Sequence, residues 1–207
     1  HAPTDRIDVR LSLLASEGQP LKHWSPVHVH LGSAHVMGRA ALLEGDRLAP
    51  ADSSLAQLVL EEKIGALTGD RVILRDPSAT RTIAGARVID PFGPPRNRRA
   101  ERRLAELAAL AEPDGDALEG LLRLATGHLD LARFSRSRNL RPAEVEELLQ
   151  ASDGVALAGF GFLATTLAEA KQDILETLKA FHESKPDAPG LQAERQRVAL
   201  KRRWPAP

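Results

Sequence analysis

The residues best suited to bind a ligand surround a short polar loop between two strand-like segments. Arg75 ends the first segment, Arg81 and Thr82 begin the second, and Ser78 and Thr80 lie between them. Guanidinium groups, hydroxyls and backbone N–H groups are the donors that proteins direct at the phosphate and sugar oxygens of RNA. We therefore predict an RNA contact at this loop, with a plain surface hairpin as the alternative.

A second set of candidate donors follows where the chain becomes rich in proline. Its five members are Arg96, Arg98, Arg99, Arg102 and Arg103. Each arginine that engages a phosphate adds to a salt-dependent affinity. Glu101 and Glu106 are interspersed with these arginines, so a solvated helix face is the other interpretation.

Composition argues against catalysis and metal binding in this chain. The 207 residues include no Cys, which excludes disulfides, thiolate metal sites and a cysteine nucleophile. His28 and His30 share one face of a predicted strand, but no carboxylate has ligand spacing around them, so we predict no metal site. No Ser-His-Asp grouping and no G-x-x-x-x-G-K-[ST] phosphate loop occurs, so we predict no catalytic residue and no cofactor.

The charge balance and the hydrophobic pattern bear on location and partners. The formal net charge is zero, with 28 Lys and Arg against 28 Asp and Glu, so any phosphate contact depends on local patches. No apolar run reaches transmembrane length and the first residues lack a signal-peptide pattern, which predicts a cytoplasmic protein without membrane contact. Because the chain begins with His1 instead of Met, we interpret it as a fragment.

The polar loop belongs to a stretch of the chain that is rich in strand signals. Six strand-like runs, separated mostly by turn formers, occupy residues 7–14, 27–31, 35–43, 55–62, 71–75 and 82–90. Ile7, Val9 and Leu11 alternate with polar residues, as in a strand with one buried and one solvated face. We predict an antiparallel six-stranded β-barrel over residues 1–95.

The apolar spacing changes after the proline-rich segment, from two to about 3.6 residues. Helices are predicted near 104–111, 118–125 (stopping at Gly127), 130–137 and 142–150, the last beginning at Pro142. Two short apolar runs around Gly159 and Gly161 then complete the helix, turn, helix and wing of a winged helix over residues 96–166.

The last part of the chain is predicted to be helical. Thr166 is expected to cap a helix whose apolar stripe runs from Leu167 to Phe181. A shorter helix follows the PDAPG break, so we interpret residues 167–207 as the start of a second, truncated winged helix. The fold class predicted for the chain is therefore α+β multidomain.

The winged helix is a poor candidate for reading nucleic acid. Its second helix, at 142–150, would classically face the groove, but it carries Glu144, Glu146 and Glu147. These carboxylates would repel phosphate, which favours a spacer or a protein-binding module. An RNA contact remains open through the arginines of the preceding helix, which are Arg133, Arg136 and Arg138.

The barrel segment resembles the third, β-barrel domain of translation elongation factors related to elongation factor Tu. The matching residues are Arg75, Asp76, Arg81, Thr82, Ile83, Ala84, Gly85 and Ala86. With the motif HLGSAHVMGRAALL before them and the helical segments behind them, the chain looks most like the bacterial selenocysteine-specific elongation factor.

This resemblance implies a role in delivering selenocysteyl-tRNA to the ribosome at recoded UGA codons. It implies that the loop between Arg75 and Thr82 contacts the tRNA. GTP and Mg²⁺ would belong to a GTPase domain absent from this chain, which is then not itself an enzyme. Recognition of the messenger insertion hairpin would belong to later winged helices, also absent. A winged-helix DNA-binding regulator and a protein-interaction scaffold are the alternatives.

Overall fold

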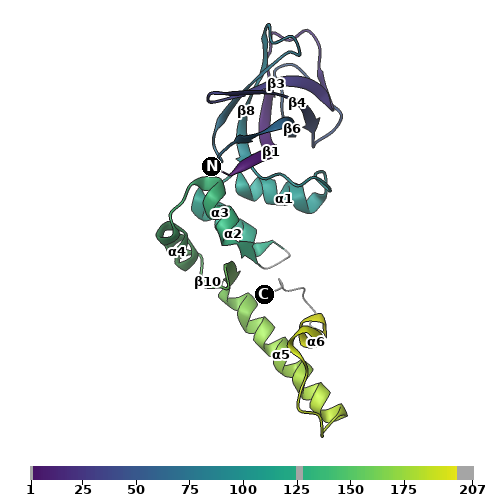
Figure 1. Cartoon of the computed structure of the whole chain (residues 1–207), viewed down its shortest axis with the longest axis vertical. Helices are drawn as coiled ribbons and strands as arrows, with labels where there is room; N and C mark the ends of the chain where they lie inside the picture. The colour runs from purple at the N-terminus through teal and green to yellow at the C-terminus, as the bar shows by residue number, and fades with distance from the viewer. Residues whose placement is uncertain (1, 125–127, 200–207) are drawn as a thin grey trace.

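The computed structural model describes residues 2–124 and 128–199, and its first part is a closed barrel (Figure 1). Six strands, all paired antiparallel, follow the order β1-β6-β4-β3-β7-β8 around it. They are β1 (Pro3–Leu13), β3 (Ser25–Leu31), β4 (Ala34–Leu42), β6 (Ser53–Gly65), β7 (Arg71–Arg75) and β8 (Thr82–Asp90). The predicted six-stranded barrel is confirmed.

Alternation of apolar and polar residues explains why these strands close on one another. Ile7, Val9 and Leu11 of β1 are fully buried, whereas Arg10 and Ser12, on either side of Leu11, are exposed. Asp8 is the exception among the intervening residues, because it is also fully buried. A strand with this pattern has one face for the barrel interior and one for solvent. The short ribbon of β2 (Leu21–Lys22) and β5 (Arg47–Leu48) was not predicted, because strands of two residues contain no periodicity.

The second part of the chain has the element order of a winged helix. Its elements are α2 (Asp114–Arg123), β9 (Leu129–Asp130), α3 (Leu131–Arg138), α4 (Pro142–Ala151), β10 (Gly154–Leu157) and β11 (Phe160–Leu163). The strands form a sheet in the order β10-β11-β9, and Leu118, Leu122, Phe134 and Leu149 are buried in one core. The predicted helix stop at Gly127 lies outside the described residues.

Helix α1 (Glu101–Leu110) connects the two parts as a packed element. Its Leu107 and Leu110 lie in one buried cluster with Leu55 and Ile89 of the barrel. Helix α2 packs closely on α1, because a Cβ on Gly120 would lie only 3.0 Å from the Ala109 Cβ. The boundary between residues 95 and 96 stays a prediction, since α1 contacts both parts.

The chain continues into a long helix, α5 (Ala164–Ser184), and a short one, α6 (Ala193–Ala199), which extend away from the barrel (Figure 1). The prediction that Thr166 caps α5 is wrong. The helix begins at Ala164, directly after β11, and the Ala164 N–H donates to the Asp153 carbonyl at 3.0 Å. Thr166 is therefore not the cap residue but lies buried in the first turn. A second winged helix starting here stays a prediction.

Within the part of the chain that the structure describes, no helix is both long and apolar enough to span a membrane.

Candidate nucleic-acid interface

The loop between β7 and β8 is organised around the carboxylate of Asp76. The Thr80 N–H donates to Oδ1 at 2.8 Å and the Arg81 N–H does so at 3.2 Å. The hydroxyls of Ser78 and Thr80 both donate to Oδ2 at 2.9 Å. These four hydrogen bonds fix the loop conformation before any ligand arrives.

The same hydrogen bonds keep Asp76 ionised. Desolvation in the loop opposes ionisation, but the hydrogen bonds from Arg81, Ser78 and Thr80 outweigh it and lower the pKa of Asp76 to about 2. Because the two hydroxyls donate inward, they present lone pairs outward, where ribose 2′-OH groups could donate to them. Sequence reasoning had assigned these hydroxyls as donors to RNA.

The two arginines at the ends of the loop differ in their surroundings. The side chain of Arg81 is 60% exposed and forms an ion pair with Glu17. Arg75 is half-buried and donates to the Thr80 carbonyl at 3.3 Å, while its Nε is buried without a hydrogen-bond partner. Thr82 is exposed opposite Arg75. All five predicted tRNA-contact residues therefore lie at one end of the β7–β8 hairpin.

Two arginines of the second predicted set attach the segment before α1 to the barrel. Arg99 donates to the Gly45 carbonyl at 2.9 Å and to Asp46 at 2.8 Å, and this hydrogen bond lowers the pKa of Asp46. The guanidinium of Arg98 lies 5.2 Å from the centre of the Trp24 ring. Both side chains thus have structural contacts within this chain.

The other three members of this set lie in different environments. Arg96 is exposed, and Arg102 donates to Glu106 at 3.1 Å. Arg103 is only 7% exposed and points into the protein. Because its guanidinium does not face solvent, Arg103 is not accessible for the RNA contact that the sequence predicted.

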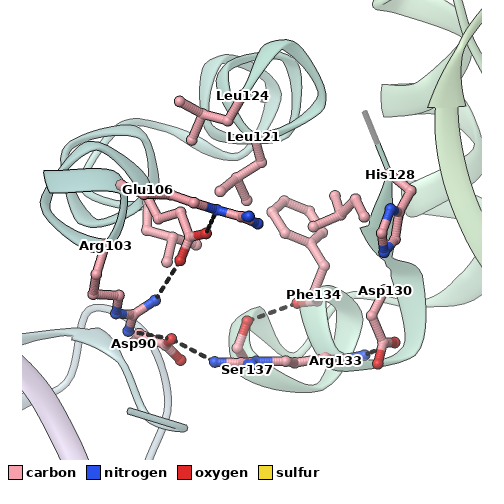
Figure 2. A pocket seen from close by; sticks show the side chains of 13 residues that line it. Asp90, Arg103, Glu106, Leu121, Leu124, His128, Asp130, Arg133, Phe134 and Ser137 are labelled. Atoms are coloured by element: carbon pink, nitrogen blue, oxygen red, sulfur yellow. Dashed lines mark hydrogen bonds and ion pairs between the residues drawn. The ribbon is translucent and has the colours of Figure 1, made fainter. Parts of the chain in front are cut away.

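Arg103 instead lies at the centre of a buried network of ion pairs between the barrel and the helices (Figure 2). We call this network the joint, and its members are Asp8, Gln57, Asp90, Arg103 and Arg133. The Arg103 Nη2 donates to Asp8 at 2.5 Å and to Asp90 at 2.7 Å. Arg133 of α3 donates to the same Asp90 oxygen at 2.7 Å, and Gln57 donates to Asp8 at 2.8 Å. Asp90 therefore binds one cation from α1 and one from α3.

The two carboxylates of the joint respond differently to burial. Burial opposes ionisation of Asp90, but Arg133 and Arg103 outweigh it and lower the pKa of Asp90. Burial raises the pKa of Asp8, because Arg103 and Gln57 offset only part of it. Asp90 is thus the stable anion that holds both arginines. A cavity of about 180 Å³ beside it is too small for a nucleotide.

Sequence reasoning did not find this joint. Asp8 and Asp90 each occur in a predicted strand, where an aspartate among apolar residues was the only available signal. Gly93 is a further part of it, since a Cβ there would lie 2.6 Å from the Gln57 side chain. Among the described residues, no three His, Asp or Glu side chains gather to hold a metal ion.

Comparison with known proteins identifies the barrel. Residues 4–95 match the family model described as selenocysteine-specific elongation factor, beta-barrel domain. The selenocysteine-specific elongation factor of Escherichia coli (strain K12) is 39% identical over 183 residues, which cover 87% of this chain and 28% of that protein. Residues 4–95 therefore belong to the beta-barrel domain family of selenocysteine-specific elongation factors. The resemblance inferred from the sequence is confirmed.

Two further comparisons agree with this result. The protein of Haemophilus influenzae (strain ATCC 51907 / DSM 11121 / KW20 / Rd) is 32% identical over 193 residues, covering 93% of this chain and 30% of that protein. The crystal structure of the bacterial selenocysteine-specific elongation factor EF-Sec matches with a TM-score of 0.63 at 18% identity, over 96% of this chain and 30% of that one, which shows a shared fold. The chain spans less than a third of these relatives.

Proposed function

We propose that this chain is the tRNA-contacting barrel and the helical arm of a translation elongation factor that delivers selenocysteyl-tRNA to the ribosome at recoded UGA codons. The observation that carries the proposal is the exposed, internally hydrogen-bonded loop from Arg75 to Thr82, in a barrel that matches this family. A loop already held in one conformation loses little conformational entropy on binding.

In this proposal the chain contributes positioning and no catalytic group. Binding and hydrolysis of GTP, with its Mg²⁺, would belong to a part of the full-length factor outside this span, and recognition of the messenger insertion hairpin to later winged helices. The factor would act in the cytoplasm, where the ribosome is its partner, without contact to a membrane.

The joint at Asp90 supports a positional mechanism. Arg103 and Arg133 reach the same carboxylate from α1 and α3, so the winged helix is held at a defined angle to the barrel. A tRNA bound to the barrel would then stand at a defined distance from the end of the arm. This geometry is what a factor needs if the arm relays messenger engagement.

The winged-helix DNA-binding regulator is less well supported. Glu144 on α4 accepts the Arg141 N–H at 2.7 Å, and Glu146 borders a groove between α3, α4 and β10. This groove, of about 870 Å³, is lined largely by apolar side chains such as Val145 and Leu149. An acidic helix beside an apolar groove suits contact with protein better than contact with phosphate.

The decisive experiment measures tRNA affinity in the full-length factor. Replacing Arg81 with Ala should weaken binding of selenocysteyl-tRNA by about 1 to 3 kcal/mol, roughly 5- to 150-fold, because a charged hydrogen bond is lost. Arg123→Ala is the matched control, since Arg123 is also exposed and pairs with a glutamate, but lies on α2. Equal affinities for the Arg81 variant and the unaltered factor would show that Arg81 does not contribute to tRNA binding.

A further inference from the structure

Three arginines form one row across the outer face of the barrel. Arg10 of β1 is paired in register with Arg87 of β8, and Arg87 is paired with Arg71 of β7. All three residues are exposed. Neighbouring strands lie about 4.8 Å apart, so the row is about 10 Å long.

This row is only partly neutralised within the protein. Like charges directly opposite one another on neighbouring strands repel and lower stability. Among the described residues, neither Arg71 nor Arg87 forms an ion pair. Arg10 lies 3.8 Å from Glu44, and both of these side chains are nearly half exposed, at 48% and 45%. The row therefore keeps positive charge that an external anion can neutralise.

The neighbouring row on the same surface contains no carboxylate. The neighbouring row of outward positions is Ser12, Gly85 and Ile73. A Cβ on Gly85 would meet no atom within 4 Å, and Ile73 is 51% exposed. Such a surface suits an extended backbone better than a small molecule.

Carboxylates approach the row mainly where the barrel meets the turn between α1 and α2. Glu112 and Asp114 line a groove of about 490 Å³ that Arg10 and Arg87 also border. Asp114 forms an ion pair with Arg138, so Glu112 is the main negative charge on that side. These acids limit how far an anionic ligand can extend in that direction.

We propose that Arg10, Arg87 and Arg71 form a second RNA-binding strip, which takes the phosphodiester backbone of a double-helical RNA. This inference rests on the proposed function and adds a site to it. Arg71 begins β7 and Arg75 ends it on the same face, so the strip and the loop are about 13 Å apart. Guanidinium groups bind phosphate through paired hydrogen bonds, and one RNA helix lying along β7 and β8 can reach both places.

The test uses the 207-residue chain and a fluorescently labelled RNA hairpin with a 12-base-pair stem. The variant carries Arg10→Gln, Arg71→Gln and Arg87→Gln. The control carries Arg47→Gln, Arg123→Gln and Arg195→Gln, which remove equal charge from exposed positions elsewhere. Fluorescence anisotropy over a range of salt concentrations gives the affinity and its salt dependence.

We expect the strip variant to bind about 10- to 100-fold more weakly than the control. The slope of log affinity against log salt should fall by about 2 to 3, close to one for each lost phosphate contact. The urea midpoint of the strip variant should stay equal or rise, because a repulsive row has been removed. A lower midpoint with unchanged RNA affinity would mean a structural role and would overturn the proposal.

Two further results would also overturn it. One is an equal loss of RNA affinity in the strip and control variants, which would reflect net charge alone. The other is a strip variant that keeps its RNA affinity but loses binding to poly-glutamate, which would assign the strip to an acidic protein.

Arg81→Ala in the same assay separates this proposal from the proposed function. Loss of RNA binding in the strip variant alone supports the strip as an RNA-binding site and argues against an RNA contact at the β7–β8 loop. Loss of RNA binding in Arg81→Ala alone supports an RNA contact at the β7–β8 loop and refutes the strip as an RNA-binding site.

Discussion

Asp76 is the residue on which the conformation of the β7–β8 loop depends. It accepts four hydrogen bonds from three residues that follow it within five positions. Only an ionised carboxylate can accept all four with both oxygens, since a protonated one would present a donor. The shape of the candidate tRNA contact is therefore linked to the charge of a residue that need not touch the tRNA.

This linkage predicts a pH dependence. The pKa of Asp76 is about 2 in the folded chain, below the ordinary value of 3.8, so its contribution to stability is present above pH 3.8 and is lost as the pH falls toward 2. The difference in urea midpoint between the unaltered chain and Asp76→Asn should therefore be largest near neutral pH and shrink below pH 4.

The matched control for this titration is Asp187→Asn, at an exposed aspartate outside the barrel. Its urea midpoint should follow that of the unaltered chain at every pH. A gap between Asp76→Asn and the unaltered chain that stays constant from pH 7 to pH 2.5 would contradict the assigned hydrogen bonds.

At the scale of elements, α1 is held to the barrel by a buried charge as well as by apolar packing. Leu107 is fully buried against barrel residues, and Arg103, one turn earlier, reaches Asp8 and Asp90. Breaking a buried pair by removing one partner is costly, because the remaining charge stays desolvated. The helix therefore cannot be treated as a flexible linker.

Replacing Arg103 with Met should lower the free energy of unfolding by about 3 to 5 kcal/mol, because Asp8 would be left buried with Gln57 as its remaining partner. Arg102→Met is the matched control on the same helix. Arg102 is 54% exposed and pairs with Glu106, so its replacement should cost less than about 1 kcal/mol. Urea unfolding followed by circular dichroism measures both; equal midpoints would show that the joint adds no stability.

At the scale of the whole molecule, the barrel and the far end of α5 lie at opposite ends of an elongated chain (Figure 1). Arg133 is the charge through which α3 contacts the end of the barrel strand β8. Its Nη2 lies 2.7 Å from Asp90, the last residue of β8, and 2.6 Å from the carbonyl oxygen of Phe92, which follows the strand. Its side chain is 45% exposed, so it adds less to stability than Arg103 but bears directly on the angle of the arm.

Arg133→Ala should therefore broaden the distribution of distances between barrel and arm while changing the urea midpoint little. Because the chain has no Cys, spin labels on Ser33→Cys and Glu183→Cys would report this distance by pulsed electron paramagnetic resonance. Arg136→Ala is the control, since the Arg136 side chain donates to the Ala132 carbonyl within α3. An unaltered distribution in Arg133→Ala would rule out Arg133 as the residue that sets the angle.

Much of the fold could be predicted because buried and exposed positions alternate along strands and helices with short, fixed periods. The alternation from Ile7 to Leu13 predicted a barrel strand, and Pro142 predicted the start of α4. Thr166 was misassigned because capping chemistry is a weaker signal than the backbone path, which here enters the helix three residues earlier, with Leu163 at the N-cap position. The loop at Arg75 to Thr82 was found from residue types, but the inward direction of its hydroxyls was not.

The amino-acid order alone decided which segments become strands or helices and to which family the barrel belongs. Barrel closure and helix docking decided which charges meet: Asp8 and Arg103 are 95 positions apart, and Arg10, Arg71 and Arg87 come from three strands. An arginine has the same chemistry whether it is buried against two carboxylates or exposed in a row of cations. Its role depends on neighbours that are distant along the chain, and no local pattern contains them.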